Sequence, residues 1–424
     1  MSALARRRVW LGLLLAVGLV AALAGVVAWL NLRGEAPLDD TPVATSPAIL
    51  ERGAYLARAG NCMGCHTVPG GPAFAGGRGV ETPFGTVYAP NLTPDPKTGL
   101  GDWSAAEFRR AMQHGRSKDG RLLYPAFPYP SYTQLTPDDT DALYVYLRSV
   151  PPVEQPDTPH GLRFPYDTQA ALAVWRALFF RPGRVADDAG QGEAWNRGRY
   201  LVQALGHCAA CHSARNALGA TPLNAEFAGG LMPDESWYAP SLASPAEAGV
   251  QAWPRDEVVA LLKHGISRSA TVSGPMAEVV FHSTQHLSEA DLEAMAQYLA
   301  GIAPRPLPTA PATPAPSAVM TRGDALYGRH CAECHGAQGQ GVAGIYPALA
   351  GNRAVTLPSA ANVVQLIRLG GFAPSTAGNP RPFGMPPFGQ TLNHDDIAAV
   401  STYIRQSWGN RGGEVTALDV LRVR

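Results

Sequence analysis

The chain has 424 residues, enough for two or three domains of ordinary size. It carries 34 basic and 34 acidic residues, and this balanced charge argues against nucleic acid or an acidic polymer as a partner. Glycine (45) and proline (38) make up roughly a fifth of the chain, compared with about 12% on average, which predicts long irregular connections between short helices.

The first 34 residues contain an apolar segment of membrane-spanning length. Arg6 to Arg8 precede an uncharged run from Val9 to Leu30. As a helix, its about 22 residues would span about 33 Å, enough for a hydrocarbon core of about 30 Å. We expect residues 1–34 to be a membrane anchor, with the arginines cytoplasmic and the rest exported. A cleaved signal peptide is the alternative, because Ala22-Leu23-Ala24 offers a cleavage site, although its apolar region usually has about 7 to 15 residues.

Three copies of Cys-x-x-Cys-His use every cysteine in the chain. They are formed by Cys62, Cys65 and His66, by Cys208, Cys211 and His212, and by Cys331, Cys334 and His335. This spacing is the signature of c-type haem attachment, in which the thiols bond to the haem and the histidine is the proximal iron ligand. A zinc site would need two more soft ligands near each pair, and a redox dithiol has no use for the histidine. We therefore predict three haem c groups.

Each motif belongs to an internal repeat. An Arg-Gly pair at the head of a helix-like stretch precedes the first cysteine by about ten residues, at Arg52, Arg197 and Arg322. Each repeat closes with a helix that has a capping residue, acidic residues in its first turn and a tyrosine at a fixed interval, at Tyr146, Tyr298 and Tyr403. The first two repeats also share the block Tyr-Ala-Pro, Trp and His-Gly, which the third lacks.

These repeats predict an all-α protein with three tandem cytochrome c domains after an N-terminal transmembrane helix. The expected domains are residues 45–150, 190–302 and 319–410. Residues 151–189 connect the first two, and the stretch from Ala170 to Phe180 is apolar enough to pack as an inter-domain helix. Residues 303–318 form a linker rich in proline and alanine, whose composition favours an extended spacer.

Two methionines are candidates for the second axial ligand. Met385 lies in Phe383-Gly384-Met385-Pro386-Pro387, and Met276 lies in Gly274-Pro275-Met276. A methionine opposite the histidine raises the haem potential. Rigid Pro/Gly loops of this kind can hold a thioether in place, whereas a core methionine is more often helical.

The first repeat has Phe127 where the other two have methionine. Phenylalanine cannot bind iron, so the first haem is expected to be spectroscopically distinct, with an open or water-bound iron or a ligand from another segment. His114 is a weaker substitute, because the corresponding His264 belongs to a repeat that already has Met276. A histidine just before a glycine fits a helix C-terminus, where the helix dipole favours it.

The order of these parts resembles the three-haem cytochrome c subunit of membrane-bound periplasmic dehydrogenases that oxidise alcohols, gluconate-type sugars or aldehydes. The matching segments cover most of the chain from about residue 45 to residue 408: Tyr88 to Asp95, Leu123 to Ala126, Trp195 to Leu201, Gly206 to Cys208, Ser283 to Leu287 and Tyr346 to Asn352. Phe127 departs from the family, whose better-known members have methionine in that loop.

The resemblance implies an electron relay in the inner membrane with its haem domains in the periplasm. Electrons would arrive from a separate catalytic subunit that carries a quinone, flavin or molybdenum cofactor, and leave to ubiquinone or a terminal oxidase. No Gly-x-Gly-x-x-Gly fingerprint and no local Ser/His/Asp motif points to catalysis by this chain itself. The alternatives are a peroxidase-like haem enzyme or a ligand sensor acting at an open first haem.

Overall fold

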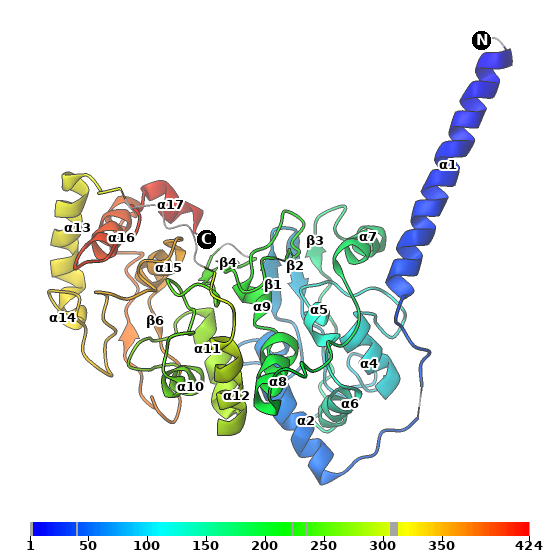
Figure 1. Cartoon of the computed structure of the whole chain (residues 1–424), viewed down its shortest axis with the longest axis horizontal. Helices are drawn as coiled ribbons and strands as arrows, with labels where there is room; N and C mark the ends of the chain where they lie inside the picture. Colours follow the sequence, from blue (N-terminus) through cyan, green and yellow to red (C-terminus); the bar gives the residue numbers. More distant parts are fainter. Residues whose placement is uncertain (1–2, 40, 223, 234–235, 306–312, 424) are drawn as a thin grey trace.

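The computed structural model describes residues 3–39, 41–222, 224–233, 236–305 and 313–423. Residues 1–2 of the expected anchor, 223, 234 and 235 of the expected second domain, and 306–312 of the Pro/Ala-rich linker lie outside the described residues. Three helical repeats follow one another across the molecule, with the second between the other two, and a long N-terminal helix projects from the first (Figure 1). The described part is predominantly helical, as predicted.

Each repeat has a first helix, a short helical turn at its Cys-x-x-Cys-His motif and a capped closing helix, which is α6, α12 or α16. Repeat 1 contains α2 (Pro47–Ala59), α3 (Cys62–His66), α4 (Ala105–His114), α5 (Tyr129–Tyr132) and α6 (Pro137–Leu147). Repeat 2 contains α8 (Glu193–Arg199), the π-helix η1 (Tyr200–Leu205), α9 (Ala209–His212), α10 (Arg255–His264), α11 (Pro275–His282), the 3-10 turn η2 (Thr284–His286) and α12 (Glu289–Ala300). Repeat 3 contains α13 (Ser317–His330), α14 (Ala332–His335), α15 (Ala361–Leu369), α16 (His394–Gln406) and α17 (Ala417–Arg422).

The Arg-Gly pair of each repeat lies where the first helix crosses the closing helix. The crossing pairs are α2 with α6, α8 with α12, and α13 with α16. A Cβ atom on the glycine would overlap a carbonyl oxygen of the closing helix, so only glycine permits this approach: Gly53 against Ala142, Gly198 against Ala294, and Gly323 against Ala399. The repeated tyrosine lies on the closing helix, one turn after this alanine, and its Cβ also lies against the glycine. These tyrosines are Tyr146, Tyr298 and Tyr403. The repeated residues therefore build one helix crossing three times.

The arginine beside each glycine binds the first turn of the closing helix. The ion pairs are Arg52 with Asp139, Arg197 with Asp291 and Arg322 with Asp396, with N–O distances of 2.7 to 2.8 Å. The backbone N–H of the same aspartate is capped by Thr136, Ser288 or Asn393. The predicted caps are confirmed, and they hold each aspartate where the arginine can reach it.

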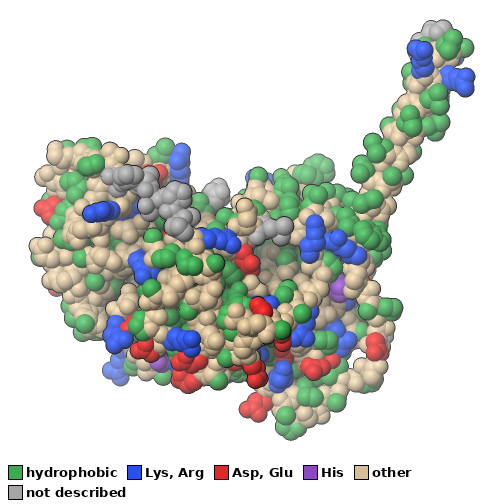
Figure 2. All heavy atoms as spheres, in the orientation of Figure 1, with side chains coloured by type: hydrophobic (Ala, Val, Ile, Leu, Met, Phe, Trp, Pro, Cys, Tyr) green, Lys and Arg blue, Asp and Glu red, His purple; other side chains and the backbone are tan. Residues whose placement is uncertain are grey.

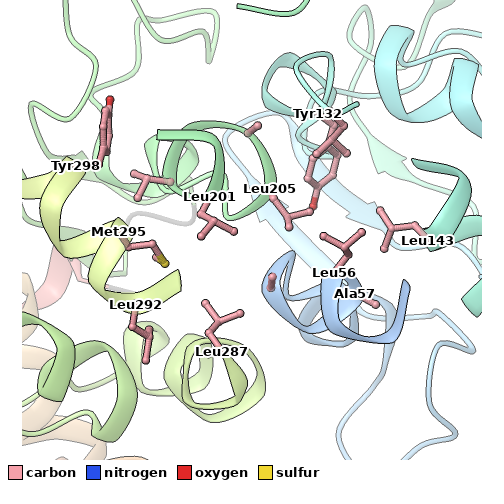
Figure 3. Close-up of a cluster of buried hydrophobic side chains, with 14 of the residues drawn as sticks. Leu56, Ala57, Tyr132, Leu143, Leu201, Leu205, Leu287, Leu292, Met295 and Tyr298 are labelled. Atoms are coloured by element: carbon pink, nitrogen blue, oxygen red, sulfur yellow. The ribbon is translucent and has the colours of Figure 1, made fainter. Parts of the chain in front are cut away.

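Repeats 1 and 2 share one hydrophobic core. Leu56 and Leu143 from repeat 1 and Leu201, Leu205 and Leu292 from repeat 2 are buried in a single cluster (Figure 3). Repeat 3 has a separate core, which takes in α15, α16 and α17. The first two repeats are thus one packed unit.

Two equivalent tyrosines join repeats 1 and 2 reciprocally. Tyr55 donates a hydrogen bond to Asp291 of repeat 2 at 2.6 Å, and Tyr200 donates one to Asp139 of repeat 1 at 2.5 Å. Each tyrosine follows its own Arg-Gly pair at the same interval, so the contact is nearly two-fold symmetric. Repeat 3 has Ala325 at this position and takes no part in the contact.

Repeat 3 docks on repeat 2 through polar contacts. The amide of Asn362 exchanges two hydrogen bonds with the backbone of Tyr238, each 2.8 Å long. Arg353 donates to the carbonyl oxygen of Gly249 at 2.9 Å and stacks over the ring of Trp253. The side chain of Tyr238 also packs against the core of repeat 3, but repeats 2 and 3 belong to separate buried clusters, in contrast to the shared core of the first two repeats.

Short antiparallel strands lie in the loops. They form the sheet β1 (Gly79–Thr82), β2 (Gly85–Tyr88) and β3 (Gly161–Leu162), the pair β4 (Gly230–Leu231) and β5 (Tyr238–Ala239), and the pair β6 (Gly371–Phe372) and β7 (Gly384–Met385). In the longest pairing Gly79 lies opposite Tyr88 and Thr82 opposite Gly85. An all-α prediction did not include these strands, because runs of two to four residues show no resolvable period-2 pattern.

Helix α1 (Ala3–Leu32) is long and apolar enough to cross a membrane. Its mean hydropathy over the best window is 2.6, and none of that window is buried against the protein. Among the described residues, its chief contact with the rest of the chain is with helix α7 (Gln169–Phe179). Helix α7 also contacts repeat 2, because Trp175 donates a hydrogen bond to the carbonyl oxygen of Leu218 at 2.9 Å. The expected inter-domain helix is therefore present.

Candidate haem-binding motifs

Each Cys-x-x-Cys-His motif forms one helical turn shortly after the first helix of its repeat, which in repeat 2 continues into the π-helix η1. The turns are α3, α9 and α14. Asn61 and His207, the residues before the first two motifs, have φ angles of 50° and 40°, so the chain bends sharply where the motif begins. In the third repeat, the residue before the motif, His330, is the last residue of α13.

All three motif histidines make the same hydrogen bond. The Nδ1 atom of His66 lies 2.9 Å from the carbonyl oxygen of Pro90, that of His212 lies 2.7 Å from Pro240, and that of His335 lies 2.9 Å from Pro347. A carbonyl oxygen can only accept, so Nδ1 carries the proton. Nε2 is then the nitrogen left for a metal, which is the usual arrangement for a ligating histidine.

Burial keeps these side chains uncharged. It lowers the pKa of His66, His212 and His335 below the ordinary value, so the rings are neutral, the form that binds a metal. Burial also raises the pKa of the Cys62 and Cys208 thiols to about 12 and that of Cys331 to about 11. Each motif thus offers two thiols for covalent attachment of the porphyrin and one imidazole whose Nε2 is left for the iron, as haem c requires. The residues fit the group.

The structure places Met385 and Met276 differently. Met385 lies in β7 and packs against the core of repeat 3, which Cys331 also contacts. Met276 lies in the first turn of α11, directly after Pro275, rather than in the loop that the sequence suggested. Proline is favoured at the first position of a helix, so Gly274-Pro275 is a helix start and not an extended loop.

Phe127 lies in an aromatic cluster beside the first motif. Its ring centroid is 5.5 Å from that of Tyr132 and 6.5 Å from that of Tyr129. Phe127 and Cys62 contact the same core. His114 is the last residue of α4, and Gly115 follows it with a φ of 57°. Its position at a helix C-terminus is therefore confirmed, and α10 ends in the same way at His264 and Gly265.

The first motif is also linked to repeat 2. Arg78 donates one hydrogen bond to the carbonyl oxygen of Gly64, inside the motif, at 2.7 Å, and another to Glu278 of α11 at 2.8 Å. Helix α11 packs on α3 accordingly. The second repeat therefore forms part of the surroundings of the first motif.

Three segments of the chain match cytochrome c family models. Residues 50–151 and 320–408 match "Cytochrome c", and residues 193–299 match "Cytochrome C oxidase, cbb3-type, subunit III". Each matched segment contains one Cys-x-x-Cys-His motif and the helix crossing that positions it. The fold and the motifs thus define a cytochrome c protein, which binds haem c covalently.

Similar proteins extend over nearly the whole chain. The cytochrome c subunit of a quinone alcohol dehydrogenase from Gluconacetobacter polyoxogenes is 38% identical to this chain. The alignment covers 93% of this chain and 88% of that subunit. The gluconate 2-dehydrogenase cytochrome c subunit of Pantoea cypripedii is 36% identical, covering 89% and 90%. The fructose dehydrogenase cytochrome subunit of Gluconobacter japonicus is 34% identical, covering 94% and 87%. The chain belongs to this family of dehydrogenase cytochrome c subunits, and its activity is electron transfer.

Sequence reasoning missed the role of the prolines. Pro90 and Pro240 stand in the shared Tyr-Ala-Pro block, and their equal place in two repeats was the available signal. The third repeat lacks that block, yet Pro347 supplies the same carbonyl oxygen only 12 residues after its histidine, compared with 24 and 28 residues in the other two. The spacing differs while the hydrogen bond is the same.

Proposed function

We propose that the chain carries three haem c groups in three cytochrome c domains, approximately residues 45–150, 190–302 and 319–410, and relays single electrons along them. The observation that supports this most directly is the hydrogen bond from Nδ1 to a proline carbonyl, which recurs at His66, His212 and His335. A relative from Cereibacter sphaeroides named as a dihaem cytochrome aligns with 67% of this chain, which agrees with two haem domains in that share.

Each haem supplies a one-electron couple at its iron, and the protein sets the attachment, the axial ligands and the surroundings. The cysteines of each motif hold the porphyrin covalently, at Cys62, Cys65, Cys208, Cys211, Cys331 and Cys334. His66, His212 and His335 present Nε2 as proximal ligands, and the proline carbonyls fix their tautomer. Met276 and Met385 would supply the thioethers that bind iron in the second and third sites, where such a ligand would raise the potential.

The electron donor is a separate catalytic subunit of a periplasmic dehydrogenase. Relatives are named as subunits of alcohol, gluconate, fructose and nicotinate dehydrogenases, so a quinoprotein, a flavoprotein or a molybdenum enzyme fits this role. Ubiquinone or a terminal oxidase is the acceptor. Helix α1 is a retained anchor in the inner membrane, with the haem domains on the periplasmic side.

Co-purification tests this assignment. A tagged chain is solubilised from its native membranes in mild detergent and captured, and the co-eluting proteins are identified by mass spectrometry. We expect a dehydrogenase catalytic subunit in stoichiometric amount, whose substrate reduces the haems when it is added. Capture of the chain alone from the soluble fraction, with no substrate able to reduce it, would contradict both the anchor and the partner.

Phe127 favours a second candidate function. With no thioether at that position, the first iron would be open to small ligands, and a peroxidase-like reaction or ligand sensing could take place there. Steady peroxide turnover that depends on His66 but is indifferent to Met276 and Met385 would support the enzyme. The absence of turnover leaves the electron relay.

A further inference from the structure

Helix α7 has an unusual distribution of side chains for a helix at a protein surface. Its sequence contains only two polar residues, Gln169 and Arg176. Arg176 is turned inward and is 2% exposed, whereas Val174 and Leu178, one turn apart on the opposite face, are 48% and 54% exposed. A surface helix normally turns its polar face to water. Helix α7 instead exposes an apolar face to the surroundings of the protein.

The apolar surface continues beyond the helix. Phe164 is 82% exposed just before α7, and Leu218 of repeat 2 is 46% exposed beside Trp175. Tyr166 packs on Phe84, with ring centroids 4.5 Å apart, and the Phe84 ring in turn lies against Gly219, the neighbour of Leu218. We call Phe164, Tyr166, Val174, Leu178 and Leu218 the α7 patch. Figure 2 shows hydrophobic side chains gathered in this part of the molecule, beside the foot of α1.

Helix α7 is fastened to the end of α1 by side chains of both helices. Asn31 donates to the carbonyl oxygen of Ala173 at 2.9 Å and accepts a hydrogen bond from Arg176 at 2.9 Å. Arg33 donates to the carbonyl oxygen of Phe180 at 2.8 Å. The apolar run of α1 ends at these residues, and the first charge after it is Arg33. A bilayer crossed by α1 would therefore end at the level of α7.

We propose that the α7 patch lies in the interfacial region of the same bilayer that α1 crosses, so that α7 is a second, monotopic membrane contact that sets the orientation of repeats 1 and 2. This rests on the proposed retained anchor. Interfacial helices of this kind place Trp, Phe and Leu about 5 to 10 Å into the boundary between headgroups and acyl chains. The aromatic residues Phe164, Tyr166 and Trp175 are of the type that collects at this depth.

Cross-linking to lipid tests the proposal in the full chain. The protein is reconstituted in nanodiscs that contain a phospholipid with a photoactivatable group on its acyl chain, and labelled peptides are mapped by mass spectrometry. We expect label in α1 and in the peptide from Phe164 to Phe179. The peptide with Leu369 and Phe372, which are 60% and 68% exposed but lie in repeat 3, is the internal control and should stay unlabelled.

A charged double variant sharpens the result. Val174→Glu with Leu178→Glu should lower the α7 labelling at least about fivefold, because a charge is costly among lipid chains, and should leave the α1 labelling unchanged. The milder pair Val174→Ser and Leu178→Ser should lower it less. Unchanged α1 labelling shows that the variants are still inserted.

The possible outcomes separate the two proposals. Label in α1 with α7 at the level of the repeat 3 control would overturn the interfacial contact and leave the anchor intact. Absence of label from both would overturn the anchor itself. If α7 were inaccessible to lipid but became protected from an aqueous labelling reagent when the catalytic subunit is added, the patch would be a protein interface, and the lipid proposal would be wrong.

Discussion

The carbonyl oxygens of three prolines decide which nitrogen of each motif histidine can face a metal. A backbone carbonyl oxygen does not change its protonation state with pH. The imidazole therefore keeps the proton on Nδ1 at every pH at which the protein is folded. Proline also has no N–H of its own, and its fixed φ restrains the segment that supplies the carbonyl. The three sites are thus alike in the hydrogen bond that their histidines make.

On the proposed ligation, Phe127 makes the first site different from the other two. We predict that Phe127→Met supplies the missing thioether, raises the potential of the first haem and makes its axial ligation resemble that of the other two. Carbon monoxide should bind to about one reduced haem in three in the wild-type protein and to almost none in the variant, which absorbance titration measures. Magnetic circular dichroism showing three identical His–Met haems in the wild-type protein would contradict this account.

At the level of helices, two glycines of α13 form a matched pair. A Cβ on Gly323 would overlap the carbonyl oxygen of Ala399, whereas a Cβ on Gly328 has nothing within 4 Å. We predict that Gly323→Ala destabilises repeat 3 by about 1 to 3 kcal/mol or more, because α16 must move away. Gly328→Ala should stabilise it by about 0.5 to 1 kcal/mol. Thermal unfolding followed by circular dichroism compares them, and equal effects would show that the crossing is looser than the structure has it.

The tyrosine contacts between repeats 1 and 2 give a second prediction. Tyr55→Phe removes a hydrogen bond to a carboxylate and should cost about 1.5 to 3 kcal/mol at neutral pH, measured by denaturant unfolding. Tyr200→Phe should cost a similar amount, and Tyr166→Phe, at the exposed surface, serves as the control. A loss no larger than that of the control would show that the reciprocal contact contributes nothing to the joint between the repeats.

The same contact should depend on pH in one direction. Burial alone would raise the pKa of Asp291, but the hydrogen bonds from Arg197 and Tyr55 outweigh it and leave the pKa below its ordinary value. A carboxylate with a lowered pKa in the folded state stabilises the fold above its unfolded pKa, and this contribution is lost as the pH falls through the folded value. The difference between wild type and Tyr55→Phe should therefore be constant near neutrality and shrink below about pH 4.

Much of this architecture was accessible from sequence because it repeats. The capped closing helices, the C-terminal positions of His114 and His264 and the apolar helix before repeat 2 all follow from local patterns, and the structure has them. Contacts between distant segments were not accessible. The Arg-Gly pair was visible as a repeat, but its partners, Asp139 and Ala142 in the first case, lie about 90 residues away, and no local pattern joins them. For Met276 the local pattern was misinterpreted: Gly274-Pro275 fits both a loop and a helix start, and the predicted loop is the first turn of a helix.

For the whole molecule, the division of the cores has a measurable consequence. Repeats 1 and 2 share one cluster of buried side chains, whereas repeat 3 has its own and meets repeat 2 through polar contacts such as Asn362 with Tyr238. We predict two unfolding transitions in denaturant, because cooperativity follows continuous packing. Gly323→Ala should shift one transition and Tyr55→Phe the other. A single transition shifted by both variants would show that all three repeats unfold as a unit.

The number of covalently bound haems tests the central claim most directly. The mature protein is purified from membranes, denatured in acid to release any porphyrin that is not covalently bound, and its intact mass is measured. We predict a mass equal to the polypeptide plus three haems, reduced by one haem when both cysteines of one motif are replaced by serine. A wild-type protein that retains two haems or fewer would contradict the account.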